Sequence, residues 1–263
     1  MLNVVKAELR KLRRPTLFFG TMGAALFFTG LITSFIYLMI DSPQGNGDRG
    51  RSIGREVLTL AGGSVNGFAS VGGFLGIIAL CVFAAQTAQE YTYGTLRNLL
   101  IRQPGRMKIL IGKLISMMLF AIVMIAIAAV VSIAISYILA PGADVSTDLW
   151  FTSAGFEAIF TTFINVTISV VAFGIVGMVL GLLLRSPISA ISFGVLWLLI
   201  VENLLIAVRN SLQSWLPGAQ LSAIASGGAP DLTYQHALTV GGLYVAVGAI
   251  VASVLFVRRD VAN

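Results

Sequence analysis

Charged residues are scarce in this chain: only 11% of its 263 residues are Asp, Glu, Lys or Arg, whereas 57% are apolar. Soluble domains carry about 25% charged residues, so this composition excludes an ordinary soluble protein. The few charges are unbalanced, with a formal net charge of +6. A basic balance beside long apolar runs is typical of a membrane face lined with Lys and Arg. We therefore expect an integral membrane protein with no nucleic-acid partner.

Residues for metal binding and catalysis are equally rare. Cys81 is the only cysteine and lies in an apolar run, which excludes an intramolecular disulfide and a cysteine-based metal site. His236 is the only histidine, and the residues after it show no HExxH pattern. Ser222 or Ser226 could pair with His236 in a membrane hydrolase, but no motif fixes their geometry. We expect a chain that is not an enzyme, without catalytic residues, bound metal or cofactor.

Six long apolar runs dominate the sequence. Each reaches the about 20 residues that a helix needs to cross a hydrocarbon core of about 30 Å. The runs are continuous rather than alternating, which predicts helices and excludes barrel strands. We expect an all-α integral membrane protein forming one domain, 1–263, without a separate soluble domain. The predicted transmembrane helices are 17–40, 67–88, 109–139, 156–184, 188–208 and 238–257.

Positive charge falls on one side of this arrangement. If the six spans alternate from a cytoplasmic N-terminus, thirteen of the seventeen Lys and Arg residues lie on the cytoplasmic side. Most acidic residues then lie outside. By the positive-inside rule, both termini are expected in the cytoplasm. The first run is too long for a cleavable signal peptide, so we expect a retained span of a multi-pass protein in the plasma membrane, a bacterial inner membrane.

Residues 1–16 predict an amphipathic helix. Leu2, Val5, Leu9 and Leu12 recur at helical spacing, and basic residues occupy the other side. Such a helix suits the surface of an anionic leaflet, which makes membrane lipids an expected partner. A basic leader that only sets the topology is the alternative.

Residues 90–113, EYTYGTLRNLLIRQPGRMKILIGK, connect the second and third predicted spans on the cytoplasmic side. The pattern predicts a short amphipathic helix that begins at Glu90 and is ended by QPG at 103–105. A loop that only sets topology could be much shorter, so we expect a partner to dock here. The basic residues that follow are expected to reach the membrane interface as the third span begins. They are Arg106, Lys108 and Lys113.

The same stretch combines a glutamate, GTLR, a leucine pair, a proline, an arginine and GK before a long apolar helix. In this pattern it resembles the cytoplasmic loop of ABC type-2 permeases, the membrane subunits of ATP-driven transporters. The basic first helix, six spans and half-apolar segment before the last span extend the resemblance over nearly the whole chain. The residues that carry it are Glu90, Gly94, Thr95, Leu96, Arg97, Leu99, Leu100, Pro104, Arg106, Gly112 and Lys113.

The resemblance implies that 89–105 is a coupling helix seated in a groove of a cytoplasmic ATP-binding subunit. Coupling is then assigned to the residues above from Glu90 to Arg106, together with Tyr93. It also implies an oligomer with a second permease copy or a homologous sister subunit. No GxxxxGK[ST] phosphate loop is present, since GRMKILIGKL has the wrong spacing and a leucine where Ser or Thr is needed. ATP and Mg are therefore expected on the separate ATPase.

Polar residues within the spans are candidates for a substrate pathway. Glu202 and Asn203 interrupt the fifth run, and charges in such runs are costly to insert. Glu202 either faces a cavity near the outer mouth, or snorkels outward or caps the external segment. Thr162 and Asn165 lie on a polar face of 156–184, which packs on protein or lines a water-accessible seam.

The external segment 209–237 mixes apolar residues with Pro-Gly breaks. Its residues alone predict an interfacial loop anchored by Trp215, whereas the resemblance implies short re-entrant helices. The steps Gly72 to Gly76 and Gly177 to Gly181 predict close helix approach.

Three functional classes remain after these observations. The first is an ABC permease subunit, an exporter of a lipid-like, peptide or antibiotic-type amphiphile (efflux). An ion-coupled secondary transporter is the second, although the sequence shows no mid-span acid pair and no internal repeat. The third is a non-transporting membrane scaffold or sensor. The sequence does not identify the substrate.

Overall fold

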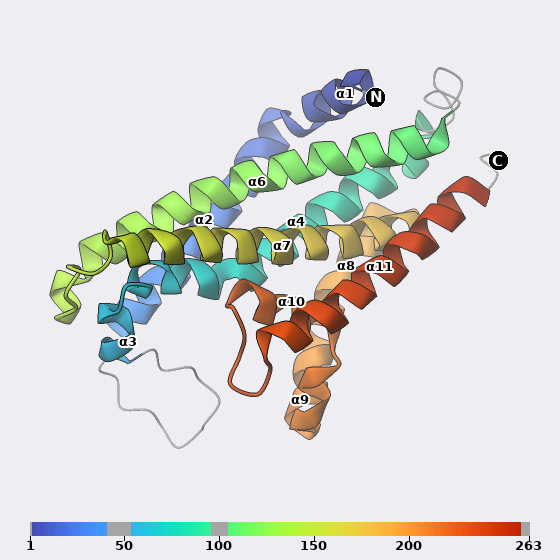
Figure 1. Ribbon diagram of the computed structural model, residues 1–263. Coiled ribbons are helices and arrows are strands. Elements are labelled where there is room, and N and C mark those ends of the chain that lie inside the picture. Colours follow the sequence, from blue (N-terminus) through green and yellow to red (C-terminus); the bar gives the residue numbers. More distant parts are fainter. Residues whose placement is uncertain (1, 41–53, 96–104, 259–263) are drawn as a thin grey trace.

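The computed structural model describes residues 2–40, 54–95 and 105–258. Within these ranges the regular structure is helical, apart from one isolated antiparallel bridge between Ala229 and Leu232. Six helical segments are long and apolar enough to cross a membrane. These confirm the all-α, multi-pass membrane architecture expected from the sequence. The segments form an elongated bundle (Figure 1).

The six spans follow the predicted runs closely. The largest differences, four residues, lie at both ends of the second span, 63–92 against 67–88, and at the start of the sixth, 234 against 238. The first three spans are α2 (Pro15–Leu38), η1 with α4 (Gly63–Val65 and Asn66–Thr92), and α6 (Arg106–Leu139). The last three are α7 (Ser153–Leu184), the column α8–η3–α9 (Pro187–Leu196, Trp197–Val201 and Glu202–Val208), and α11 (Tyr234–Arg258).

Shorter elements surround the spans. The first helix, α1, covers Leu2–Leu12 and packs on α6. Towards the end of the bundle away from α1 lie α3 (Arg55–Thr59), η2 (Pro141–Ala143), η4 (Asn210–Ser214) and α10 (Pro217–Ala225). The element η3 is a π-helical turn inside the fifth span.

The pair α4 and α7 forms the centre of the bundle, and glycine allows its backbones to approach closely. A Cβ atom added at Gly177 would lie 2.2 Å from the carbonyl oxygen of Leu80. One at Gly181 would lie 2.7 Å from the carbonyl oxygen of Ala84. The predicted close approach at these two glycines is therefore confirmed. Helices in lipid gain little from hydrophobic burial against each other, so such backbone contact supplies much of their association.

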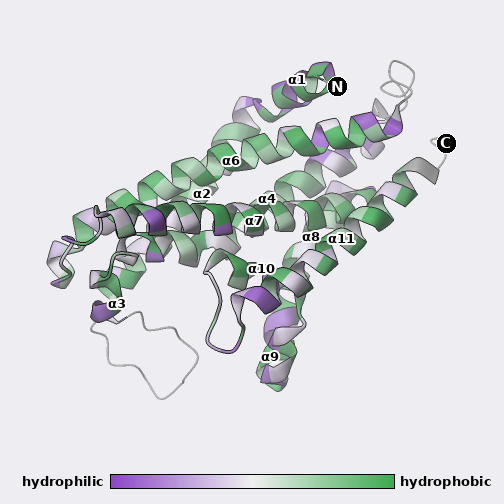
Figure 2. Ribbon diagram, in the orientation of Figure 1, coloured by the Kyte–Doolittle hydropathy of each residue, from purple (hydrophilic) through white to green (hydrophobic). Residues whose placement is uncertain are grey.

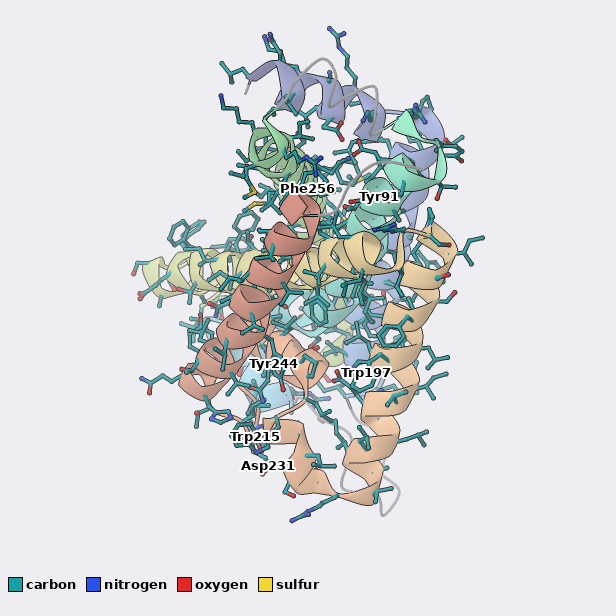
Figure 3. The ribbon with its side chains drawn as sticks, turned by 90° about the vertical axis from the view of Figure 1, so that its right-hand side faces the viewer. Tyr91, Trp197, Trp215, Asp231, Tyr244 and Phe256 are labelled. Carbon is teal, nitrogen blue, oxygen red and sulfur yellow. The ribbon has the colours of Figure 1, made fainter. Side chains whose placement is uncertain are left out.

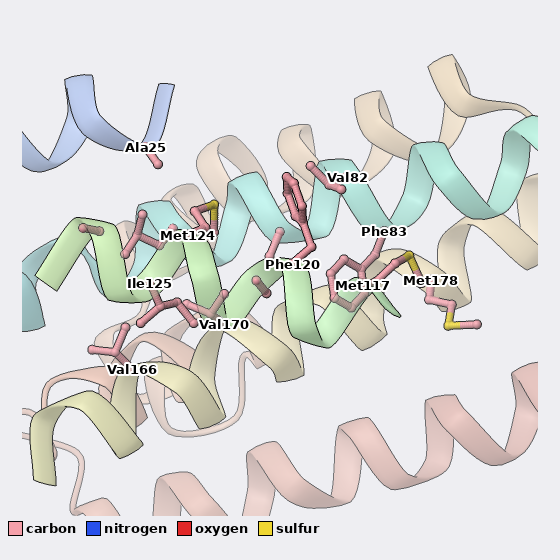
Figure 4. Close-up of a cluster of buried hydrophobic side chains, with 14 of the residues drawn as sticks. Ala25, Val82, Phe83, Met117, Phe120, Met124, Ile125, Val166, Val170 and Met178 are labelled. Atoms are coloured by element: carbon pink, nitrogen blue, oxygen red, sulfur yellow. The ribbon is translucent and has the colours of Figure 1, made fainter. Parts of the chain in front are cut away.

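The main apolar core fills the space between α2, α4, α6 and α7. Figure 4 shows Met117, Phe120, Met124 and Ile125 of α6 beside side chains of α4 and α7. Large apolar side chains on the outer faces of the same helices remain exposed, as lipid-facing positions would.

The ends of the bundle are more hydrophilic than its middle (Figure 2). At one end lie α1, the last turns of α4 and α11, and the start of α6, so the first and last helices reach the same end (Figure 1). Hydrophilic residues concentrate at the ends of the long helices, and their middles are hydrophobic (Figure 2).

Segment 209–237 contains a buried helix, whereas its residues alone predicted a loop. Helix α10 packs on α4, α7 and α11, and Leu221 and Ile224 are almost fully buried. Its small residues allow this packing, because Ala225 lies against Gly72 of α4. Trp215, just before α10, is 61% exposed.

Candidate functional site

The connection between α4 and α6 begins later than the sequence predicted. Helix α4 continues to Thr92, so Glu90 lies in its last turn and does not start a separate helix. The break comes at Gly94, whose φ of +64° is a conformation that glycine adopts readily. The polar residues before Gly94 continue α4 beyond the apolar run, and for this reason the sequence pattern placed the start of a new helix at Glu90. The side chains of Tyr93 and Thr95 are exposed, and Leu96, Arg97, Leu99, Leu100 and Pro104 lie outside the described residues.

Four charged side chains from three helices meet beside this connection. We call Glu8 and Lys11 of α1, Glu90 of α4 and Lys113 of α6 the charge cluster. The ammonium nitrogen Nζ of Lys113 lies 2.7 Å from Oε2 of Glu8 and 2.9 Å from Oε1 of Glu90. Lys11 bridges the same two acids: its Nζ donates to Glu8, and lies 2.9 Å from Oε1 of Glu90. The cluster is neutral and ties α1, α4 and α6 together.

Lys113 is buried, so the prediction that it reaches the membrane interface was wrong. Its side chain is 3% exposed, and its ammonium also donates to the carbonyl oxygen of Gln86 at 3.2 Å. Two carboxylates within reach supply the partners that a buried ammonium requires. Lys108, one turn and a half earlier, is exposed.

The buried stripe of α1 explains why the sequence reading missed Glu8. The predicted face included Leu2, which is 76% exposed; the buried stripe instead runs through Val4, Glu8 and Leu12. An acid spaced one helical turn from apolar residues on both sides was the available signal. The stripe sits against Gly112 of α6, where an added Cβ would lie 2.8 Å from the side chain of Val4.

Opposing effects act on the pKa values of the α1 members. Burial alone would raise the pKa of Glu8, but the charges of Lys113 and Lys11 and their hydrogen bonds outweigh it and lower the pKa. Burial would lower the pKa of Lys11, and the attraction of Glu90 and Glu8 outweighs it and raises the pKa. Both groups therefore hold their charge over a wider pH range than in the unfolded chain.

The same end of the bundle has further polar contacts. The guanidinium of Arg185, in the turn between α7 and α8, lies 5.7 Å from the ring centroid of Tyr91. Arg106 donates from its guanidinium to the carbonyl oxygen of Phe256 at 3.4 Å. The ends of α4 and α6 thus contact both the α7–α8 turn and α11; Figure 3 labels Tyr91 and Phe256 at this end.

Glu202 lies towards the other end of the bundle and caps α10. Its Oε1 accepts hydrogen bonds from the indole N–H of Trp197 at 2.9 Å and from the backbone N–H of Gly218 at 3.0 Å. Its Oε2 accepts from the backbone N–H of Ala219 at 3.1 Å. A carboxylate at a helix N-terminus satisfies donors that have no partner within the helix. Figure 3 shows Trp197 on the side of the α8–η3–α9 column that faces the rest of the molecule.

The candidate pathway residues line two neighbouring pockets. Glu202 and Asn203 line one of about 510 Å³ between α4, the α8–η3–α9 column and α10, which we call the α10 pocket. Thr162 and Asn165 line a second pocket of about 430 Å³, and Asn165 accepts a hydrogen bond from the hydroxyl of Tyr234 at 2.7 Å. Both pockets are lined by Ala69 and Ser226. Glu202 therefore both caps α10 and borders a cavity.

His236 lies apart from the two serines that were considered as its partners. His236 Nε2 lies 2.9 Å from the carbonyl oxygen of Ser214, and within the described ranges no hydrogen bond joins its side chain to Ser222 or Ser226. No group of three His, Cys, Asp or Glu side chains there could hold a metal ion.

The comparison with protein families places the chain in one of them. Residues 53–262 match the family described as protein of unknown function (DUF2705). The chain belongs to the DUF2705 family. No curated protein matches it.

The DUF2705 match covers two of the four residues of the charge cluster. Glu90 and Lys113 lie within the matched residues, whereas Glu8 and Lys11 precede them. The α10 pocket lies entirely within the match.

Proposed function

We propose that this DUF2705 protein is the membrane-spanning subunit of an ATP-driven transporter of the ABC type-2 class. A separate cytoplasmic ATPase binds the connection between α4 and α6 and carries the ATP and Mg. Two permease chains, identical or homologous, pair with the ATPases in a bacterial cell membrane. The charge cluster, which lies beside this connection, is the observation that supports the proposal most.

The cluster supports force transmission because its charges are buried. Breaking a buried ion pair by removing one partner costs about 3–5 kcal/mol. Glu8, Glu90 and Lys113 are each less than 10% exposed, so α1, α4 and α6 separate only at such a cost. A partner that displaces the connection would therefore move both flanking helices and α1 as one body. A loop that served only topology would not require this arrangement.

The lengths of the flanking helices fit the same role. At 1.5 Å per residue, the 34 residues of α6 measure about 51 Å, well beyond a hydrocarbon core of about 30 Å. One end of α6 can thus project from the membrane towards a soluble partner while its middle packs against α4 and α7. This makes α6 a suitable lever.

The distribution of charge supports a cytoplasmic location for this end. Lys6, Arg10 and Arg13 of the first segment are exposed, while Val4 and Leu12 are buried against the bundle. Positive side chains favour the cytoplasmic face and an anionic leaflet. We accordingly assign both termini to the cytoplasm and α1 to the membrane surface.

The transported molecule would occupy the pockets at the opposite end. The α10 pocket and its neighbour combine apolar walls with isolated polar groups, which suits an amphiphile better than an ion. Export of a lipid-like, peptide or antibiotic-type amphiphile is the activity that we propose.

Purification of the tagged chain from its native membrane tests the proposal. We expect an ABC ATPase to co-purify and its hydrolysis to depend on the chain. Leu96→Glu should uncouple hydrolysis from transport, whereas Leu60→Glu, an exposed position at the other end, should not. Transport without an ATPase would indicate a secondary transporter. A partner without stimulated hydrolysis would indicate a scaffold.

A further inference from the structure

We propose that the α10 pocket binds an amphiphile whose polar head is a protonated amine, with Glu202 as its counter-charge. The inference deepens the proposed function by naming a ligand class. It concerns equilibrium binding to this chain, so it can be tested without any ATPase. Failure of binding and failure of ATPase coupling would therefore be distinguishable.

The size and walls of the pocket suit an apolar body. Its volume of about 510 Å³ lies within the range of about 300–1,000 Å³ that is usual for small-molecule sites. Phe74 and Ile77 of α4, Phe173 of α7 and Leu198 of η3 supply apolar wall. The α8–η3–α9 column, which forms one side, is the least buried of the six spans. An amphiphile could therefore reach the pocket from the surrounding lipid.

The electrostatics of the pocket select a cation. Glu202 is 3% exposed, and its carboxylate oxygens accept hydrogen bonds from three N–H donors, which offset part of the cost of burying the carboxylate. No Lys or Arg in the described ranges forms a salt bridge with it, and neither pocket is lined by a basic residue. The N-terminus of α10 offsets only about half a charge.

The available acceptors match an ammonium group. A carboxylate oxygen can accept two hydrogen bonds, and Oε2 of Glu202 accepts one, from Ala219. The side-chain nitrogen of Asn203 donates to the carbonyl oxygens of Leu198 and Leu199, which leaves its amide oxygen as an acceptor. Ser222 adds a hydroxyl to the same pocket. An ammonium with three donors could bond to these groups, whereas a phosphate or sulfate head would meet a carboxylate.

Equilibrium binding of dansylcadaverine to the full chain in phosphatidylcholine nanodiscs tests the inference. This probe joins an apolar ring system to a primary ammonium, and its N-acetyl derivative keeps the ring system and loses the charge. Saturable fluorescence enhancement should give a dissociation constant at least tenfold lower for the amine than for the acetyl derivative. Empty nanodiscs provide the correction for partitioning into lipid.

Three variants locate the site. Glu202→Gln should weaken amine binding about tenfold or more and leave the acetyl derivative unaffected. Glu56→Gln, an exposed acid on α3, is the matched control and should bind as the parent chain does. Leu199→Trp enlarges a side chain that lines the pocket and is not one of the hydrogen-bond partners of Glu202; it should weaken both probes, so it keeps the test valid if Glu202→Gln fails to fold. Equal affinity for amine and acetyl derivative, unchanged amine binding in a folded Glu202→Gln variant, or unchanged binding of both probes in Leu199→Trp would overturn the inference.

Discussion

Replacement of Lys113 by methionine perturbs the charge cluster most directly. Methionine has a similar length and suits a buried, apolar environment, so the change removes the ammonium with little loss of volume. Glu8 and Glu90 then retain a single cation, Lys11, which bonds to both. One negative charge is left uncompensated in a buried site.

The expected loss of unfolding free energy follows from the burial of the Lys113 ion pairs and from the cation that remains, Lys11. Removing one partner of a buried ion pair costs about 3–5 kcal/mol. We expect the lower end, about 3 kcal/mol, because the side chain of Lys11 is 36% exposed and can still reach both acids. The double variant Glu8→Met with Lys113→Met restores neutrality and leaves Lys11 with Glu90. It should recover at least about 1 kcal/mol relative to the sum of the single losses.

The free energy of unfolding of the purified chain, followed by tryptophan fluorescence during a denaturing-detergent titration, measures these losses. Lys108→Met is the matched control: an exposed lysine on the same helix, whose loss should change the free energy by less than about 0.5 kcal/mol. If Lys113→Met unfolds no more readily than Lys108→Met, or the double variant shows no coupling, the cluster does not join the three helices energetically.

Three further predictions address other parts of the structure. Because the pKa of Glu8 is lowered in the folded state, its stabilisation is present above the usual value of 4.5 and is lost as pH falls below it; the difference in unfolding midpoint between the parent chain and Glu8→Gln should shrink there, and a constant difference would contradict the pKa shift. Gly112→Ala should lower the free energy of unfolding by about 1–3 kcal/mol by pressing on α1, whereas Gly23→Ala, which meets nothing within 4 Å, should not; equal effects would refute the close contact. Trp197→Phe removes a hydrogen-bond donor from the buried carboxylate of Glu202 and should lower the free energy of unfolding by about 1.5–3 kcal/mol. The control Trp215→Phe, at an exposed position, should have little effect, and equal losses in the two variants would argue against the Glu202 cap of α10.

The spans were predictable because a membrane-crossing helix is recorded in local composition. A run such as 109–139 contains its own hydrogen bonds and its own apolar surface, so no distant residue is needed to recognise it. The ends were less certain: α4 extends past 88 because Gln89, Glu90 and Tyr91 continue its hydrogen bonding outside the apolar run. Hydropathy predicts where a segment leaves the apolar core of the membrane, and the helix can continue beyond that point.

The candidate sites were only partly predictable because they join distant residues. Glu8 meets Lys113 across 105 positions, and no local pattern records that pairing. The sequence marked Glu202 as unusual, but only the fold supplies its partners at Gly218 and Ala219. A charged residue in an apolar stripe thus indicates that a partner exists, but it does not identify the partner residue.

Accessibility of position 93 shows whether the connection between α4 and α6 faces the cytoplasm and is covered by an ATPase. In a Cys81→Ser background, Tyr93→Cys and Ser146→Cys place single thiols at exposed positions near opposite ends of the bundle. We expect a membrane-impermeant maleimide to label position 93 only in inside-out vesicles, bound ATPase to protect position 93, and position 146 to be labelled only in right-side-out vesicles. Labelling of position 93 from the exterior, or no protection by the ATPase, would contradict the account.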